Sequence, residues 1–234
     1  RVPVTLHENG LDDAVLHAFS MEGPKPDLSR WQKISEIKAN PPKIAKIAVV
    51  GKYVSLGDSY KSLNEALVHG GLAHEAGVEI DFVDSEALET MSAHEVASRL
   101  QDAGGILVPG GFGARGTEGK IKAVTYAREH NVPYFGICLG MQLACIEFAR
   151  NVASLSGAGS TEFSEELGIP KHPLIGLMTE WDKDGEVEAR TEATDLGGTL
   201  RLGGYPCALQ KGTKSLEAYG IKNITERHRH RYEF

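Results

Sequence analysis

The regular alternation of short apolar runs with longer segments of helical periodicity constrains the fold more than any other feature of this chain. Residues 44–51 form a nearly continuous apolar run, as in strands buried on both faces of a parallel sheet. The alternation predicts an α/β fold with a mainly parallel sheet, helices on both faces and ligands at the carboxyl ends of the strands. Ser92 and Glu95 are spaced as a capping box at the start of one helix. The further expected strands are 78–83, 105–109 and 132–137, and the expected helices are 59–76, 92–101, 117–130 and 139–152.

The first 43 residues stand outside this alternation. They contain short amphipathic stretches that are interrupted by Gly23-Pro24-Lys25-Pro26, and Pro41-Pro42 closes the segment. We interpret residues 1–43 as a linker that arrives from a domain absent from this sequence, and residues 44–234 as the α/β domain, with its C-terminal part missing.

Beyond residue 152 the pattern becomes looser, and the turn signals are closer together. We expect Gly203-Gly204 to separate two short strands. A basic run from Glu226 to Glu233 closes this region. The expected elements are a loop at 160–163, a strand within 172–180, a turn at 181–185, strands at 199–203 and 205–210, and a short helix at 216–220.

Composition narrows the class of protein. The chain has 234 residues, a formal net charge of −7 and no long basic stripe, which argues against a dedicated nucleic-acid binder. Its three cysteines are an odd number and do not make a disulfide framework. Without a signal peptide or an apolar run of about 18 residues, the sequence favours a soluble, cytoplasmic protein that makes no membrane contact.

A Gly-x-Cys-x-Gly pattern lies between the last expected strand of the alternation and its helix. Gly136 and Gly140 flank Cys138 as in the thiol version of the nucleophile elbow, a sharp strand-to-helix turn that lifts one side chain above the sheet. The start of a helix also favours thiolate over thiol. Cys138 is therefore the candidate nucleophile, whereas Cys145 and Cys207 have no such context and are expected to be core residues.

A second glycine-rich segment follows the strand expected at 105–109. Gly111, Gly113 and Gly116 match the Gly-x-Gly-x-x-Gly pattern of dinucleotide-binding proteins, but the next strand lacks the acidic residue that would hold the ribose. We favour an oxyanion hole, in which the backbone N–H groups of Gly111 and Leu139 hold the charge of a tetrahedral adduct. An ordinary glycine-rich turn is the alternative.

The chain offers no convincing base for a cysteine nucleophile. His74 and His94 fall in expected helices and are interpreted as solvated. His230, near Glu233, is the remaining candidate, but neighbouring strand residues point to opposite faces and the surrounding basic run suits ligand binding equally well. Lys61 lacks the P-loop spacing and is expected to be a solvated residue on sequence grounds.

Taken together, the motifs resemble one protein family. The elbow, the glycine loop and the late basic run occur with Ser160-Thr161-Glu162-Phe163 and with Asp58-Ser59-Tyr60-Lys61-Ser62. This combination is similar to the CTP synthase family, in its C-terminal glutamine amidotransferase domain of class I (triad) type, and it extends over nearly the whole chain. The resemblance implies a flavodoxin-like α/β fold that follows a linker.

Position by position, the resemblance implies a role for each matched residue. Cys138 would attack the side-chain amide of L-glutamine, release ammonia and form a glutamyl thioester, with Gly111 and Leu139 as oxyanion donors. Lys61 and residues 113–119 would lie where the family senses GTP, its allosteric activator. The residues implied to bind glutamine are Gly111, Leu139, Gly140, Met141, Gln142, Glu162 and Arg231.

The resemblance also implies what this domain lacks. It would need no cofactor or metal of its own, whereas ATP and Mg²⁺ belong to a synthase domain that aminates UTP to CTP. That synthase domain would be its partner, and the full-length family members are expected to be homotetramers. The family's base and the acid that orients it lie in a His-Pro-Glu segment, expected beyond Phe234, so residues 1–234 alone are expected to show no useful glutaminase activity.

Two other functions fit the same motifs. One is a cysteine γ-glutamyl hydrolase of the same fold, which protection of Cys138 by a γ-glutamyl peptide would indicate. The other is a non-catalytic nucleotide-sensing module, which an ordinary and slowly alkylated Cys138 thiol would favour.

Overall fold

The computed structural model describes residues 1–52, 57–177, 180–183, 186–189 and 201–234. These residues divide into two compact units. One comprises residues 1–108 and 118–135, and the other comprises residues 109–117 and 136–234. The main sheet lies almost wholly in the first unit, and Cys138 lies in the second.

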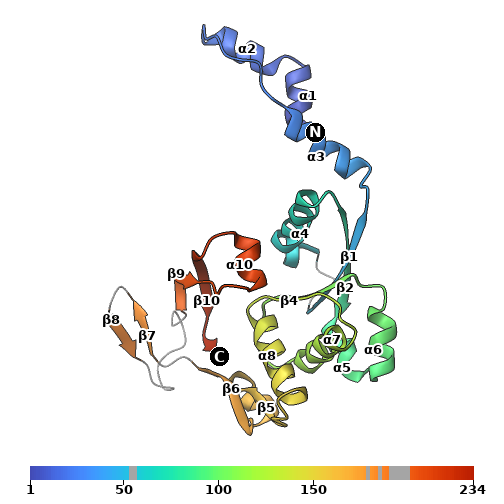
Figure 1. Ribbon diagram of the computed structural model, residues 1–234, viewed down its shortest axis with the longest axis vertical. Helices are drawn as coiled ribbons and strands as arrows, with labels where there is room; N and C mark the ends of the chain where they lie inside the picture. Colours follow the sequence, from blue (N-terminus) through green and yellow to red (C-terminus); the bar gives the residue numbers. More distant parts are fainter. Residues whose placement is uncertain (53–56, 178–179, 184–185, 190–200) are drawn as a thin grey trace. The chain divides into compact units, whose positions relative to one another are not determined.

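A four-stranded sheet in the order β2-β1-β3-β4 forms the centre of the first unit. Its strands are β1 (Ile44–Gly51), β2 (Gly77–Asp84), β3 (Gly105–Val108) and β4 (Tyr134–Gly136). The first strand runs parallel to both of its neighbours, with Ile44 opposite Gly77 and Ile47 opposite Gly105 (Figure 1). The predicted α/β architecture with a mainly parallel sheet is confirmed.

Helices cover both faces of this sheet because the strand order reverses direction. The chain reaches β2 through η1 (Gly57–Tyr60) and α4 (Lys61–Ala73), and it then returns past β1 through α5 (Ser85–Thr90), α6 (Ala93–Leu100) and α7 (Thr117–Glu129). Since parallel crossovers are right-handed, connections that run in opposite directions along a sheet lie on opposite faces. We therefore assign α4 to one face and the other three helices to the opposite face.

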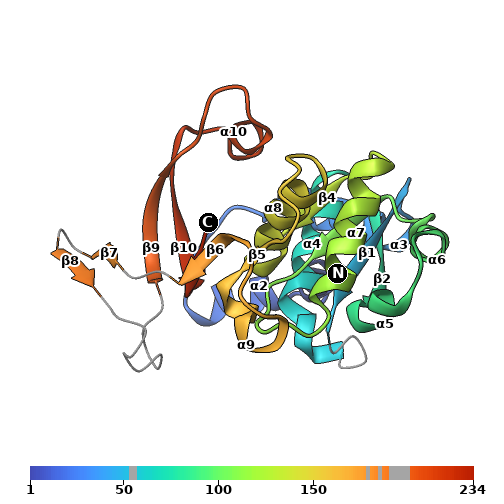
Figure 2. The same ribbon diagram turned by 90° about the horizontal axis from the view of Figure 1, so that it is seen from below.

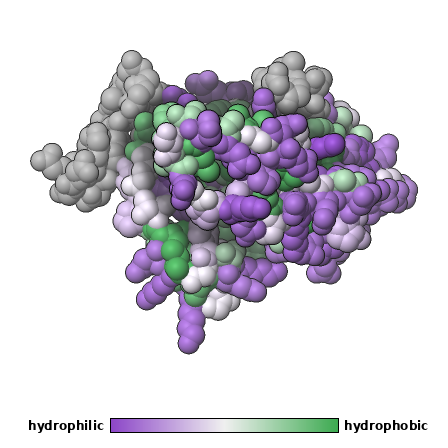
Figure 3. Space-filling model, turned by 90° about the horizontal axis from the view of Figure 1, so that it is seen from above, coloured by the Kyte–Doolittle hydropathy of each residue, from purple (hydrophilic) through white to green (hydrophobic). Residues whose placement is uncertain are grey.

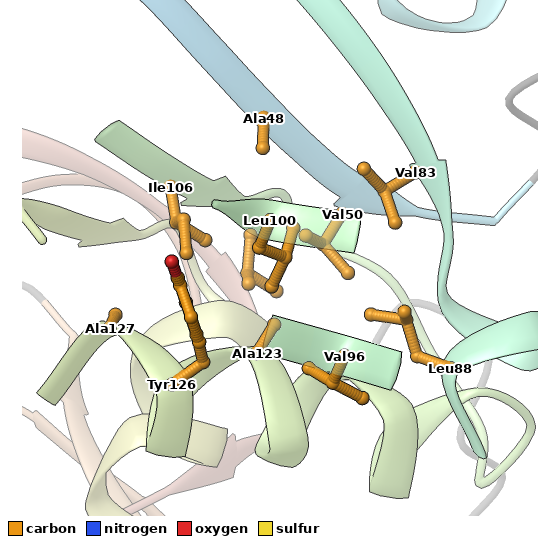
Figure 4. Packing of buried hydrophobic residues seen from close by; sticks show 11 residues of the cluster. Ala48, Val50, Val83, Leu88, Val96, Leu100, Ile106, Ala123, Tyr126 and Ala127 are labelled. Atoms are coloured by element: carbon orange, nitrogen blue, oxygen red, sulfur yellow. The ribbon is translucent and has the colours of Figure 1, made fainter. Parts of the chain in front are cut away.

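The main hydrophobic core lies between the sheet and α5, α6 and α7. Ala48 and Val50 both belong to it, because alternate residues of a strand share one face. Figure 4 shows Tyr126 of α7 pointing toward Ile106 of β3. Each fully buried aliphatic side chain of this kind contributes about 1.5–3 kcal/mol relative to exposure. The whole cluster comprises Ala48, Val50, Val83, Leu88, Val96, Leu100, Ile106, Val108, Ala123, Tyr126 and Ala127.

Three helices precede the sheet: α1 (Val2–Glu8), α2 (Leu11–Ala18) and α3 (Ser29–Ala39). The last two correspond to the amphipathic stretches of the sequence, whereas α1 is additional. Its Pro3 lies in the first turn, where a missing N–H does no harm. Neither α1 nor α2 has a buried residue, and α3 buries only Ile37.

In the second unit, α8 (Leu139–Asn151) leads into a three-stranded sheet in the order β11-β6-β5. Its strands are β5 (Ala158–Ser160), β6 (His172–Leu177) and β11 (Tyr232–Glu233), and Arg150 of α8 donates a 2.7 Å hydrogen bond to the Ala158 carbonyl. The loop expected at 160–163 is wrong. Ser160 ends β5, and the 3₁₀ turn η2 (Thr161–Phe163) follows and continues into α9 (Ser164–Leu167).

The rest of the second unit forms two antiparallel ladders. The first joins β7 (Glu180–Lys183) to β8 (Glu186–Ala189), and the turn expected at 181–185 lies partly outside the described residues. The second joins β9 (Arg201–Ala208) to β10 (Asn223–His230), with α10 (Lys214–Tyr219) between them in sequence (Figure 2). A turn at Gly203-Gly204 is a wrong prediction, because both glycines lie inside β9 and pair with His228 and Arg227.

Polar residues dominate the face shown in Figure 3, where hydrophobic residues form smaller areas between them. Charged residues make up 24% of the chain, enough to cover such a face. No helix in the described ranges is both long and apolar enough to cross a membrane.

Candidate active site

Cys138 occupies a strained turn at the junction of β4 and α8. It is the N-cap residue of α8, with φ 52° and ψ −108°. Non-glycine residues rarely adopt such a positive φ, which costs on the order of 1–3 kcal/mol and is concentrated at functional sites. The structure therefore has the backbone geometry that the Gly-x-Cys-x-Gly pattern predicts for a nucleophile elbow.

Gly136 makes this sharp turn possible. A Cβ atom at this position would lie 2.5 Å from the Met141 backbone nitrogen and equally against the Gly140 carbonyl group. Real Cβ atoms do not approach backbone so closely, so only glycine lets the strand end pass this near to the first turn of α8. The glycine two residues before the nucleophile thus has a steric reason.

The glycine-rich segment at 109–116, here called the glycine loop, lies directly beside the nucleophile. The Cβ position of Gly110 is 3.5 Å from the Cys138 Cβ atom, and Gly111 is the next residue. Gly113 has φ +76°, in the left-handed region that favours glycine. This contact places the segment that carries Gly111 beside Cys138, which lies 28 residues after Gly110 in the sequence, as the oxyanion-hole hypothesis requires.

Glu162 fastens the same loop through a contact that the sequence does not reveal. Its Oε1 atom accepts a hydrogen bond of 2.8 Å from the Gly113 N–H. The Glu162 N–H in turn donates to the Ser160 hydroxyl at 3.1 Å, and Ser160 is only 3% exposed. Ser160 is absent from the predicted site, although it belongs to the motif at 160–163 and has a capping position two residues before Glu162.

Gln142 and Arg231 are connected through Tyr232, the first residue of the short strand β11. The Gln142 side chain is buried and its Nε2 atom donates a 2.8 Å hydrogen bond to the Tyr232 carbonyl. Arg231 precedes Tyr232, and its Nε atom is buried with no acceptor among the described residues. Because a buried donor without a partner costs about 1–3 kcal/mol, this atom is well suited to receive a ligand oxygen.

The thiol of Cys138 is less acidic than the position at a helix start suggests. Burial raises the pKa of Cys138 above its ordinary value, the Leu139 N–H opposes this by hydrogen bonding to the sulfur, and the Glu162 carboxylate raises the pKa further. The N–H at the helix start therefore acts in the expected direction on the pKa of Cys138, but burial acts against it. An activating group is needed for a thiolate at neutral pH.

The remaining elbow residues line the start of α8. Leu139 and Gly140 are buried, and the Gly140 N–H donates to the Ile137 carbonyl at 2.9 Å. Met141 is 45% exposed, and its sulfur lies 3.7 Å from the Cys145 thiol. Cys145 and Cys207 are both only partly buried, which corrects their prediction as core residues.

His230 belongs to a hydrogen-bond network of its own hairpin. Its Nε2 atom lies 2.8 Å from Nδ1 of His228, and its Nδ1 atom lies 3.3 Å from the Tyr232 carbonyl oxygen and 3.6 Å from the Glu233 carboxylate. In the described part of the chain, no histidine is among the groups that shift the pKa of Cys138. The structure thus gives no support to His230 as the base.

The residues implied to sense GTP differ in their surroundings. Lys61 is the exposed first residue of α4, whereas Gly119 lies inside α7. A side chain at Gly119 would strike the Ser85 carbonyl, so this glycine serves helix packing. Among the described residues, no group of three or more His, Cys, Asp or Glu side chains could hold a metal ion.

Comparison with known proteins places this chain in a family. The model of class-I glutamine amidotransferases matches residues 55–234. The chain is 58% identical over 238 residues to the CTP synthase of Azospirillum brasilense and 56% identical over 233 residues to that of Zymomonas mobilis subsp. mobilis. These matches cover 100% and 99% of this chain but 42% of each relative, so the chain spans less than half the length of these proteins.

A solved structure agrees with this relationship. The glutaminase domain of the Trypanosoma brucei CTPS, with bound acivicin, is 39% identical to this chain and superimposes with a TM-score of 0.67. The match covers 81% of this chain and 67% of that one. On these grounds, and by a family match over most of its length, the chain belongs to the class-I glutamine amidotransferases.

Proposed function

We propose that this chain is the glutaminase part of a CTP synthase, which hydrolyses L-glutamine and supplies ammonia for the ATP-dependent amination of UTP to CTP. The observation that carries the proposal is the strained elbow at Cys138 with the glycine loop packed beside it. The name of the curated relatives and the binding of acivicin, a glutamine analogue, to the Trypanosoma brucei domain support it.

The chemistry follows from the elbow. The Cys138 thiolate adds to the amide carbon of glutamine, and the C=O π electrons move to the oxygen, which the N–H groups of Gly111 and Leu139 hold. When the carbonyl re-forms, the protonated nitrogen leaves as ammonia and a γ-glutamyl thioester remains. Water then attacks the thioester, releasing glutamate and regenerating the thiol.

We further propose that charged and polar groups of the second unit hold the other end of the substrate. In this proposal the Glu162 carboxylate receives the α-ammonium group. The Nε of Arg231, which has no acceptor within the part of the chain that the structure describes, meets a substrate oxygen. Met141 and Gly140 border the nucleophile on α8. Gln142 acts on the substrate indirectly, because its side-chain amide donates a hydrogen bond to the Tyr232 carbonyl beside Arg231.

Activation of the thiol needs a base, because burial raises the pKa of Cys138. We take this base from the His-Pro-Glu segment that the family resemblance implies, and not from His230. A histidine there would accept the thiol proton before attack and return it to the leaving nitrogen.

The wider assembly is part of the same proposal. Residues 1–43 would link the glutaminase domain, 44–234, to the synthase domain, whose ATP and Mg²⁺ are not needed for glutamine hydrolysis. Lys61, exposed at the start of α4, is available to an effector such as GTP. We expect a cytoplasmic homotetramer for the full-length protein.

The decisive experiment substitutes the nucleophile in the full-length protein. Cys138→Ser should abolish CTP formation from glutamine and leave CTP formation from ammonium chloride intact, while the half-buried control Cys207→Ser keeps both. Hydrolysis of γ-glutamyl peptides without glutamine-dependent CTP formation would identify a γ-glutamyl hydrolase. If the unsubstituted protein shows neither activity, that result would favour a nucleotide-sensing module.

A further inference from the structure

The contact between Glu162 and Gly113 joins two parts of the site that are 49 residues apart in the sequence. The carboxylate accepts the Gly113 N–H at 2.8 Å, a length typical of a charge-assisted hydrogen bond. Glu162 is itself held, because its own N–H is bonded to the Ser160 hydroxyl and the adjacent Phe163 is only 5% exposed. The carboxylate is therefore a fixed point for the loop.

The glycine loop is then held on both sides of its oxyanion donor. On one side Gly110 packs against the Cys138 Cβ atom, and on the other side Gly113 is bonded to Glu162. Gly111 lies between these two points. A run of glycines has few intrinsic conformational preferences, so without such contacts its N–H groups have no fixed direction.

We propose that Glu162 is a positioning residue for the oxyanion hole: its hydrogen bond to Gly113 fixes the loop so that Gly111 presents its N–H to the substrate oxygen. This inference rests on the function proposed above and gives Glu162 a second role beside recognition of the α-ammonium group. Removal of one oxyanion donor costs about 10²–10³ in rate in other enzymes, and a misdirected donor loses part of that.

A ligand without an ammonium group separates the two roles. The probe is 5-oxopentanoate, an aldehyde with the carbon chain and carboxylate of glutamine but no amino group. The Cys138 thiolate adds to its aldehyde carbon, an S–C bond forms, and the π electrons pass to the oxygen that the hole must hold. The dissociation constant of this thiohemiacetal with the full-length protein is independent of ammonium recognition. Measured above the pKa of Cys138 in each variant, where the thiol is ionised throughout, it reports on how well the oxygen is held.

Three variants distinguish the hydrogen bond from the charge. Glu162→Ala should weaken the aldehyde adduct about tenfold, whereas Glu162→Gln, whose amide oxygen can still accept from Gly113, should stay within about threefold. Ser160→Ala keeps the charge but loosens the Glu162 backbone, so it should weaken the adduct by an intermediate amount. Both Glu162 variants should raise the KM for glutamine, because each lacks the charge that attracts the ammonium group.

The control is Glu166→Ala, an exposed neighbour on α9, which should change neither quantity. Thermal unfolding establishes that each variant is folded at the assay temperature. Unchanged aldehyde binding in Glu162→Ala, or equal weakening in Glu162→Ala and Glu162→Gln, would overturn the positioning role even if the KM for glutamine rises. If the unsubstituted protein forms no adduct, that result would instead contradict the proposed function, and the inference that rests on it would be wrong as well.

Discussion

The side-chain amide of Gln142 donates a hydrogen bond of 2.8 Å to the backbone carbonyl of Tyr232. Gln142 lies in the first turns of α8, four residues after the nucleophile, and is 5% exposed. Tyr232 begins β11, directly after Arg231. The hydrogen bond thus connects the helix that follows Cys138 to the strand that follows Arg231.

Replacement of Gln142 by leucine should therefore weaken glutamine binding more than it slows the reaction. The change leaves the partly buried Tyr232 carbonyl without this donor, at a cost of about 1 kcal/mol, and frees the segment that carries Arg231. We expect a KM for glutamine raised about tenfold with kcat nearly unchanged, measured by steady-state kinetics of the full-length protein. Gln32→Leu on the exposed side of α3 is the control, and a fall in kcat at constant KM would contradict this reasoning.

Gly136→Ala should disrupt the elbow itself. The new methyl group would lie 2.5 Å from the Met141 nitrogen, and the atoms that it meets are all backbone atoms of the Gly140–Met141 peptide, which cannot rotate away as a flexible side chain could. We expect destabilisation of about 3 kcal/mol by urea unfolding, near the upper end for overpacking, together with loss of glutaminase activity in the full-length protein.

Gly70→Ala provides a matched control for that experiment. Gly70 lies inside α4, and apart from its chain neighbours and the helix's own backbone no atom of the described residues lies within 4 Å of its Cβ position. The substitution should stabilise the chain by about 0.5–1 kcal/mol, because alanine is the better helix former. Equal effects of the two substitutions would mean that the close approach at Gly136 is not what the turn requires.

Sequence reasoning succeeds where the signals of an element are close together in the chain and fails where distant pairing decides. The capping box of α6 was predictable because its signals are adjacent: the Ser92 N–H donates to the Glu95 carboxylate at 2.7 Å, and the Glu95 N–H donates to the Ser92 hydroxyl at 3.4 Å. The elbow was predictable for the same reason. By contrast, Gly203 and Gly204 indicate a turn locally, and only their pairing with the distant β10 places them inside a strand.

The chemistry of the site is predictable from sequence to a similar depth. The sequence predicts Cys138 and Gly111 as site residues, and the family resemblance adds Glu162. The hydrogen bond from the Gly113 N–H to Glu162 depends on how the second unit packs. The acidity of Cys138 also depends on packing. The helix start is visible in the sequence, whereas the burial that raises the pKa is not.

The pH dependence of Cys138 alkylation in this chain follows from that raised pKa. Only the thiolate reacts, so the iodoacetamide rate at Cys138 should rise with pH around a midpoint above that of a free thiol such as glutathione. Glu162→Gln should lower the midpoint, because the Glu162 charge disfavours the thiolate. Mass spectrometry of the Cys138 peptide separates this reaction from that of Cys145, whose pKa is also raised by burial.

Protein stability gives an independent check of the same shift. The folded chain holds the Cys138 proton more tightly than the unfolded chain does, so this contribution to stability is fully present below the unfolded pKa. It is lost as the pH rises through the folded pKa. Cys138→Ser should therefore reduce the loss of stability seen on the alkaline side, and an unchanged alkaline slope, or a midpoint below that of glutathione, would contradict the raised pKa.

Substitution of His230 by glutamine decides whether the hairpin supplies the base. In the structure the ring of His230 is engaged by His228 and lies near the Tyr232 carbonyl, at 2.8 Å and 3.3 Å. Loss of a general base costs about 10²–10⁴ in rate, whereas loss of one hydrogen bond within a hairpin costs about 0.5–1.5 kcal/mol, or roughly tenfold at most. We expect kcat of the full-length His230→Gln protein to fall less than tenfold, with the larger change in KM because Tyr232 adjoins Arg231. A fall of a hundredfold or more in kcat, restored by added imidazole, would instead make His230 the base.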